Sequence, residues 1–177
     1  MSNIPSYIKM FPSSKDIFAD RVEEHSKSLF PVFSVDLNHI NPAWTGQIHM
    51  VQFNEDPYNE ETVNTFNDYC KDCMIGFDII NGKYSFKTDF AYFNLTGSWK
   101  QWFEKTKSSF TNTKQKFLNT GVLTSPNDNP ADIYEQIGGE PNWVQSDETP
   151  TDPDGNPMTF IAETYTGNYT DDSCAKH

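Results

Sequence analysis

Apolar and polar positions in the first third of the chain follow a helical period and then a strand-like one. Apolar residues recur at roughly helical spacing from Lys15 to Leu29, after two serines that can cap a helix. Pro31 is expected to end this helix. Two runs rich in β-forming residues follow, over 32–37 and 46–53. The pattern therefore predicts one helix and two strands.

The clearest local signal is the pair Asn81-Gly82, which lies between two alternating runs within 74–93. Asn-Gly is the preferred two-residue hairpin turn, because both central residues take a positive φ. The alternation places Phe77 and Ile79 on one face. The sequence predicts a β-hairpin here.

Two helices are predicted on either side of this hairpin. The first runs from its cap at Asn59 to about Lys71, with glutamates near the positive end of the helix dipole. The second, long helix runs from Trp99 to Asn119, with Gly121 beyond its end. Its lysines are interpreted as a solvated face.

The last third contains many turn residues. Pro130 is expected to start a short helix that carries Ile133 and Ile137. Gly138 can take the left-handed conformation that ends a helix, and Pro141 makes its neighbour extended.

A short strand carrying Trp143, a polar loop from Asp147 to Pro157 and a second strand ending at Glu163 are predicted next. Trp143 is expected in the core because of its large apolar area. Strands and helices alternate without a regular strand–helix–strand period, which predicts a single α+β domain over 1–177 with a largely antiparallel sheet and flanking helices. After Asp171 no closing element is recognised, so we expect either a tail without regular structure or a longer native chain.

Composition and charge narrow the choice of partners. Aromatic residues make up 15% of the 177 residues and can supply most of the buried area. The formal charge of −12 opposes binding to nucleic acid or to an anionic membrane, whereas a basic protein or a cation remains a suitable partner. No signal peptide and no apolar run of about 20 residues is recognised, which predicts a soluble, cytoplasmic protein.

A calcium loop is one candidate site. The residues Asp152, Asp154, Asn156 and Glu163 have the spacing of its oxygen ligands. Pro157 stands where such a loop needs a sharp glycine turn, and the flanks are predicted strands. A turn built by Asx hydrogen bonds is the alternative that we favour.

A zinc site is a second candidate. Cys70 and Cys73 form one pair of ligands, and Cys174 and His177 form another, which together would make a Cys3His site. The pairs lie far apart in the sequence, and one ends at the last residue. We therefore favour a partly buried thiol pair, and the odd number of cysteines predicts no disulfide framework.

Enzyme templates are missing from the sequence. There is no Gly-x-Ser-x-Gly elbow, phosphate-binding glycine loop or His-Glu-x-x-His motif. The four histidines are His25, His39, His49 and His177. An unrecognised hydrolase would need one of them beside a carboxylate in space, so we expect no catalytic residues.

One stretch carries a family resemblance. The residues Gly138, Gly139, Pro141, Trp143 and Gln145, followed by Gly155, Met158 and Phe160, resemble the Gly-Gly-x-Pro-x-Trp-x-Gln … Gly-x-x-Met-x-Phe-x-x-Gln pattern of the YwqG-like bacterial family of unknown function. The resemblance covers only 137–163. Many members carry Cys-x-x-Cys before the second glycine, where this chain has Asp152-Pro-Asp154, and their final Gln is Glu163 here.

The resemblance implies a partner-binding or immunity-type role, since some members are encoded near contact-dependent toxins. The sequence as a whole therefore predicts a non-catalytic protein-binding domain whose acidic surface engages a basic partner. A metal-binding domain is the alternative, with calcium or zinc at the two sites named above.

Overall fold

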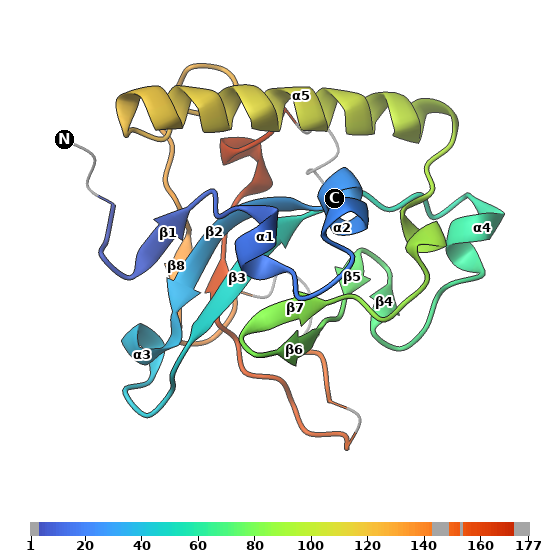
Figure 1. Ribbon diagram of the computed structural model, residues 1–177, viewed down its shortest axis with the longest axis horizontal. Helices are drawn as coiled ribbons and strands as arrows, with labels where there is room; N and C mark the ends of the chain where they lie inside the picture. The colour runs from blue at the N-terminus through green and yellow to red at the C-terminus, as the bar shows by residue number, and fades with distance from the viewer. Residues whose placement is uncertain (1–3, 143–148, 153, 172–177) are drawn as a thin grey trace.

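A three-stranded antiparallel sheet lies at the centre of an α+β fold, with the order β1-β2-β3 (Figure 1). The computed structural model describes residues 4–142, 149–152 and 154–171. The strands are β1 (Ile8–Met10), β2 (Phe30–Asp36), β3 (Gln47–Gln52), β4 (Cys70–Lys71), β5 (Met74–Ile75), β6 (Asp78–Ile80), β7 (Lys83–Ser85), β8 (Gln136–Ile137) and β9 (Ala162–Glu163). The helices are α1 (Ser14–Ile17), α2 (Val22–Ser28), α3 (Leu37–Ile40), α4 (Glu60–Val63), η1 (Phe90–Phe93), α5 (Gly97–Thr120) and η2 (Thr166–Asn168).

The two predicted strands, 32–37 and 46–53, are confirmed as β2 and β3. They pair with each other, and β1 covers the second edge of β2. Pro31 lies inside β2, beside a register shift, and does not end a helix. A proline is tolerated where a bulge interrupts the ladder, because no hydrogen bond is then required of its missing N–H.

The single helix predicted from Lys15 is wrong, since α1 and α2 are separate. Ser13 caps α1 as predicted, and its Oγ accepts a hydrogen bond from the Asp16 N–H at 3.3 Å. Phe18 is then extended and pairs with Tyr84 in a β-bridge. The chain leaves the helix because it joins β7 in tertiary structure, which overrides the helical period.

The long predicted helix is confirmed as α5, which lies across one side of the central sheet (Figure 1). Gly121 ends it with φ of 70°. Phe110 on its buried face contacts the rings of Phe11 and Phe30, with centroids 5.6 and 5.2 Å apart. These rings belong to the first of two hydrophobic clusters.

The second cluster joins α1, β7 and η1, and its members include Phe18, Phe86 and Tyr92. The predicted hairpin is confirmed as β6–β7, and Asn81 and Gly82 have φ of 52° and 76°. Both values match the turn that Asn-Gly prefers.

The helix predicted over 59–71 is wrong beyond its first turn. Asn59 caps α4 as expected, but α4 ends at Val63. The chain then forms the β4–β5 hairpin, whose turn residues Asp72 and Cys73 have positive φ. A turn precedes this hairpin, because Asn67 and Cys70 exchange backbone hydrogen bonds of 3.2 and 3.3 Å. Backbone bonding within this turn replaces a continued helix.

The short helix predicted after Pro130 is also wrong. Pro130 forms a bridge with Thr124, and the chain then enters β8, which pairs with β9. Pairing with a distant segment satisfies the backbone groups that a helix would have satisfied locally. Within the described ranges, no helix is long and apolar enough to cross a membrane.

Candidate functional site: a groove beside the two small hairpins

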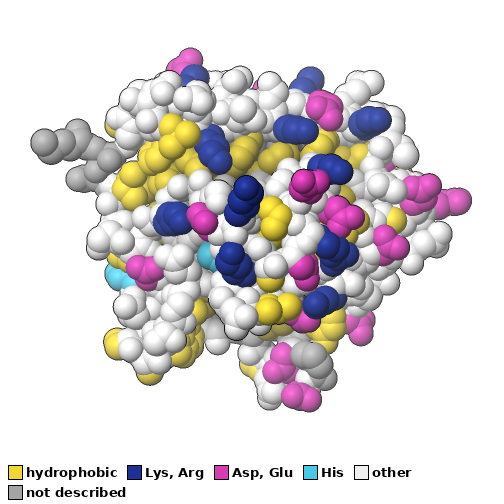
Figure 2. All heavy atoms as spheres, in the orientation of Figure 1, with side chains coloured by type: hydrophobic (Ala, Val, Ile, Leu, Met, Phe, Trp, Pro, Cys, Tyr) yellow, Lys and Arg dark blue, Asp and Glu magenta, His cyan; other side chains and the backbone are white. Residues whose placement is uncertain are grey.

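A groove runs between the two small hairpins and the loop formed by residues 149–152 and 154–158. It consists of two adjoining cavities of about 520 and about 620 Å³. Tyr69, Ile75, Gly76 and Met158 line both. We call this feature the hairpin groove. In Figure 1 the loop lies below β6. Figure 2, in the same orientation, shows acidic side chains on this loop.

The wall formed by β6 and β7 is built from stacked aromatic rings. Phe77 stacks on Tyr84 with centroids 4.8 Å apart and planes 22° apart. The Tyr84 hydroxyl accepts a hydrogen bond from the His49 backbone N–H at 2.8 Å. Burial raises the pKa of Tyr84 to about 12, so this hydroxyl stays protonated near neutral pH. The ring of Tyr84 is therefore uncharged and fixed to the central sheet.

Gly76 permits a close approach at the junction of the two cavities. A Cβ on Gly76 would lie 2.9 Å from the Tyr69 Cβ. This distance is shorter than a normal contact, so any side chain at this position would displace Tyr69 or the turn that contains it. Glycine thus sets the width of the groove.

Apolar side chains remain exposed along the groove. Ile79 is 59% exposed, Met158 46% and Tyr69 37%. Exposed apolar side chains that gather beside a cavity are typical of binding sites. These residues were not among the sites predicted from the sequence. The available signal was the adjacent pair Ile79 and Ile80, because neighbouring strand residues point to opposite faces.

The charged side chains of the groove are mainly acidic. Asp68, Asp78 and Asp152 line it, against a single lysine, Lys87. Asp78 lies 3.9 Å from Lys87, and Asp68 lies 3.6 Å from Lys71. Both pairs are solvent-exposed and therefore weak, so these carboxylates can accept another cation.

The predicted calcium loop is organised by hydrogen bonds within the protein. Asp152 Oδ1 accepts from the backbone N–H groups of Asp154 and Asn156, each at 2.9 Å. The Asn156 side-chain amide also donates to this carboxylate. The hydrogen bonds from Asn156, first from its side chain and then from its backbone, hold the pKa of Asp152 below the usual value. The geometry is that of an Asx turn, the alternative favoured from the sequence. Glu163 lies in β9, opposite Gln136.

The predicted zinc ligands are only partly described. Cys70 is buried, and its Sγ accepts a hydrogen bond from the Thr88 hydroxyl at 3.0 Å. Burial, followed by the charge of Glu55, raises the pKa of the Cys73 thiol, which disfavours the thiolate that a metal needs. Cys174 and His177 lie outside the described residues. Across residues 4–142, 149–152 and 154–171, no group of three or more His, Cys, Asp or Glu is placed to hold a metal ion.

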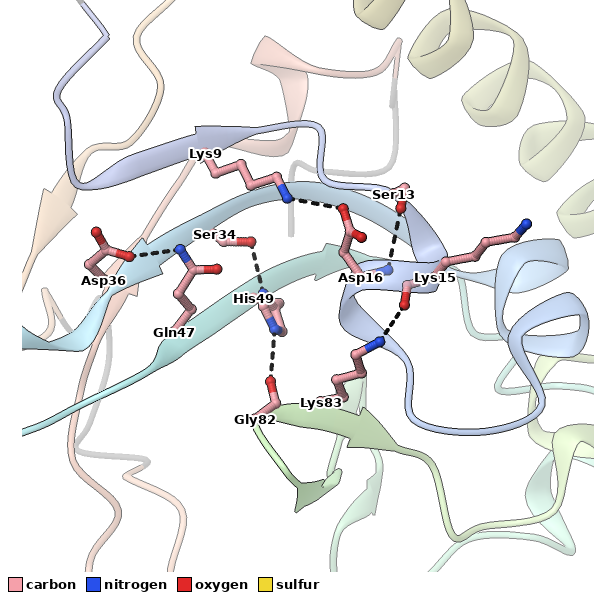
Figure 3. A network of polar contacts seen from close by, with 10 residues as sticks. All are labelled: Lys9, Ser13, Lys15, Asp16, Ser34, Asp36, Gln47, His49, Gly82 and Lys83. Carbon is pink, nitrogen blue, oxygen red and sulfur yellow. Dashed lines mark hydrogen bonds and ion pairs between the residues drawn. The ribbon is translucent and has the colours of Figure 1, made fainter.

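His49 belongs to a closed polar network (Figure 3). Its Nε2 donates to the Gly82 carbonyl at 3.2 Å, so Nδ1 accepts from the Ser34 hydroxyl at 2.8 Å. Both side chains are buried. Burial lowers the pKa of His49, which keeps the ring neutral. This serine–histidine pair joins the sheet to the hairpin turn and has no open face for a substrate.

The other two described histidines are also held by neighbours. His25 is buried and stacks on Phe18, with centroids 4.3 Å apart. His39 stacks on Tyr7 at 3.5 Å.

The corner that carries the family resemblance has positive φ at Gly138 and Gly139, 65° and 79°. The corner follows strand β8, and Gln136 holds it. The Gln136 side-chain amide donates to the carbonyls of Gly138 and Glu140, each at 2.8 Å. The sequence analysis did not identify this amide.

Pro141 follows within the described chain, whereas Trp143 and Gln145 lie outside it. No family model, curated protein or solved structure matches the chain. The resemblance to the YwqG-like family stays a prediction.

Proposed function

We propose that this is a non-catalytic binding protein whose hairpin groove takes a basic, partly apolar segment of a protein partner. The observation that carries the proposal is the group of exposed apolar side chains, Tyr69, Ile79 and Met158, beside cavities with a largely acidic lining. Apolar burial would supply affinity, and the carboxylates would favour lysine and arginine over acidic segments.

An immunity-type or otherwise inhibitory role is the biological context that we infer. Two features support it. The net charge of −12 would steer a basic target toward the protein, and the segment 137–163 resembles a family with members encoded near toxins.

Selection from a phage-displayed library of random peptides tests the proposal without a known partner. We expect selected peptides to combine apolar residues with lysine or arginine. Their affinity should fall at least about tenfold for Ile79→Asp and Met158→Asp, because each change places a charge among apolar side chains. Raising the salt from about 20 mM to about 500 mM should also weaken binding.

Leu118→Asp is the matched control, because Leu118 is an exposed apolar residue on α5 and does not line the groove. This variant should bind as the wild type does. Failure to enrich any peptide, or equal binding by the groove variants and the wild type, would contradict the proposed function.

A further inference from the structure

Strand β6 is an edge strand beside the hairpin groove. It pairs with β7 on one side. The other edge of β7 is already covered, because the Ala19 N–H donates to the Tyr84 carbonyl at 2.9 Å. Among the described residues none pairs with the outer edge of β6, so this is the edge at which a further strand can join the small sheet.

The hairpin register determines which backbone groups of β6 are free. Ile79 lies opposite Tyr84, whose carbonyl points away from β6 toward Ala19. In an antiparallel ladder, opposite residues point their backbone groups the same way relative to the pair, either both inward or both outward. The N–H and C=O of Ile79 therefore point outward. The C=O of Phe77, just before β6, also points outward, because the trans peptide places it opposite the inward N–H of Asp78. Within the described chain, neither residue makes a backbone hydrogen bond across this edge.

The two faces of β6 differ in chemistry. Phe77 and Ile79 lie on the face of Tyr84, within the apolar part of the groove. Asp78 lies on the opposite face together with Lys83 and Lys87, and its carboxylate is 3.9 Å from Lys87, so this face carries charges of both signs. A strand added to β6 would direct alternate side chains to these two environments.

We propose that the partner binds by strand addition, as an extended antiparallel segment of alternating apolar and basic residues paired with the outer edge of β6. This inference rests on the proposed function of the groove. Each apolar residue of the segment lies opposite Phe77 or Ile79 and bonds to its backbone N–H and C=O. The residues between them lie on the Asp78 face, and their basic character is inferred from the net charge of −12 rather than from the charges of this face.

Methylated peptides test this hydrogen bonding directly. The probe is the capped peptide Lys-Val-Lys-Val-Lys-Val-Lys, titrated at low salt by calorimetry. N-methylation of the valines removes the N–H groups that would bond to β6, whereas N-methylation of the inner lysines removes N–H groups that point away. Relative to the unmodified peptide, we expect at least about a tenfold loss of affinity for the valine-methylated peptide and less than about a threefold loss for the lysine-methylated peptide.

A protein variant provides an independent test. Ile79→Pro removes the outward N–H while the hairpin ladder stays intact, since Ile79 makes no bond to β7. Ile79→Ala is its control, because it shortens the side chain and keeps the N–H. Ile79→Pro should lower the affinity for the unmodified peptide by a factor at least about fivefold greater than Ile79→Ala does. Circular dichroism and thermal melts establish that both variants are folded.

The outcomes separate the two proposals. If the peptide binds and loses affinity on Met158→Asp, but the two methylated peptides bind alike, strand addition is overturned and the groove stays the binding site. A larger loss for the lysine-methylated peptide also overturns the assigned pairing. If the unmodified peptide does not bind, or binds Met158→Asp as tightly as the wild type, the proposed function fails together with strand addition.

Discussion

At the scale of single residues, Gly76 allows a close approach to Tyr69 at the junction of the two cavities of the hairpin groove. A Cβ at this position would lie 2.9 Å from the Tyr69 Cβ and 3.4 Å from the Tyr69 carbonyl oxygen. The close atoms belong to the backbone and the base of the side chain, which cannot rotate away. We expect Gly76→Ala to destabilise the protein by about 1–3 kcal/mol in denaturant melts, because the backbone at Gly76 or at Tyr69 must shift to relieve the overlap.

A double-mutant cycle isolates this contact. Tyr69→Gly removes the Cβ that the introduced methyl group would meet, so the additional cost of Gly76→Ala should shrink by at least about 1 kcal/mol in that background. An equal cost in both backgrounds would show that Tyr69 is not the obstacle.

Asp152 gives a second prediction at this scale. Its carboxylate already accepts hydrogen bonds from Asp154 and Asn156. We expect millimolar calcium to leave the melting temperature unchanged, in the wild type and in Asp154→Ala alike, because no stabilising ligand is bound. A calcium-dependent rise that Asp154→Ala abolishes would restore the calcium loop predicted from the sequence spacing.

At the scale of elements, the start of α5 depends on a buried carboxylate from a distant loop. Asp56 is fully buried. Its Oδ2 accepts from the backbone N–H and the hydroxyl of Thr96, at 2.9 and 2.8 Å, and its Oδ1 accepts from the Tyr58 N–H at 3.1 Å. Thr96 is the N-cap of α5 and makes no side-chain capping bond of its own. The carboxylate therefore fixes the position of the N-cap residue, from which α5 begins.

Asp56→Ala is expected to cost about 2–4 kcal/mol of unfolding free energy, because three donors lose a charged acceptor in a buried position. Thr96→Ala removes only the hydroxyl bond and should cost about 1 kcal/mol. Chemical denaturation measures both values. Equal costs would mean that the two backbone hydrogen bonds contribute little.

At the scale of the whole molecule, two buried histidines couple stability to pH. Burial is the largest cause that lowers the pKa of His25 and His49 from the ordinary value of 6.5. His25 Nε2 accepts from the Phe86 N–H, and Nδ1 donates to the Arg21 carbonyl, so the neutral ring is fully bonded. A proton on Nε2 would break the bond to Phe86.

The unfolded chain takes up protons below pH 6.5, whereas the folded protein resists them. The unfolded state then binds more protons, so stability is complete above that pH and falls as pH decreases through it. We expect the free energy of unfolding to be lower at about pH 5.5 than at about pH 7.5. The variant carrying His25→Gln and His49→Gln should be less stable at the higher pH and lose this slope. A flat wild-type profile would contradict the prediction.

The sequence by itself determined the features that arise from neighbouring residues. Asn81-Gly82 specified the β6–β7 turn, since both residues readily take positive φ. The extent of α5 followed from its uninterrupted helix-forming run and the glycine at position 121. The α+β class and the pairing segments of β2 and β3 followed in the same way.

Only the tertiary structure decided in which segments pairing with distant residues overrides the conformation that the local pattern predicts. Phe18 is extended despite the helical pattern around it, because it forms a β-bridge with Tyr84. Strand β8 stands where a helix was predicted, because it pairs with β9. The hairpin groove likewise brings Tyr69 and Met158 together from distant parts of the sequence. Local patterns report the preference of a segment for its own conformation, whereas pairing and burial depend on partners far along the chain, whose positions no local period encodes.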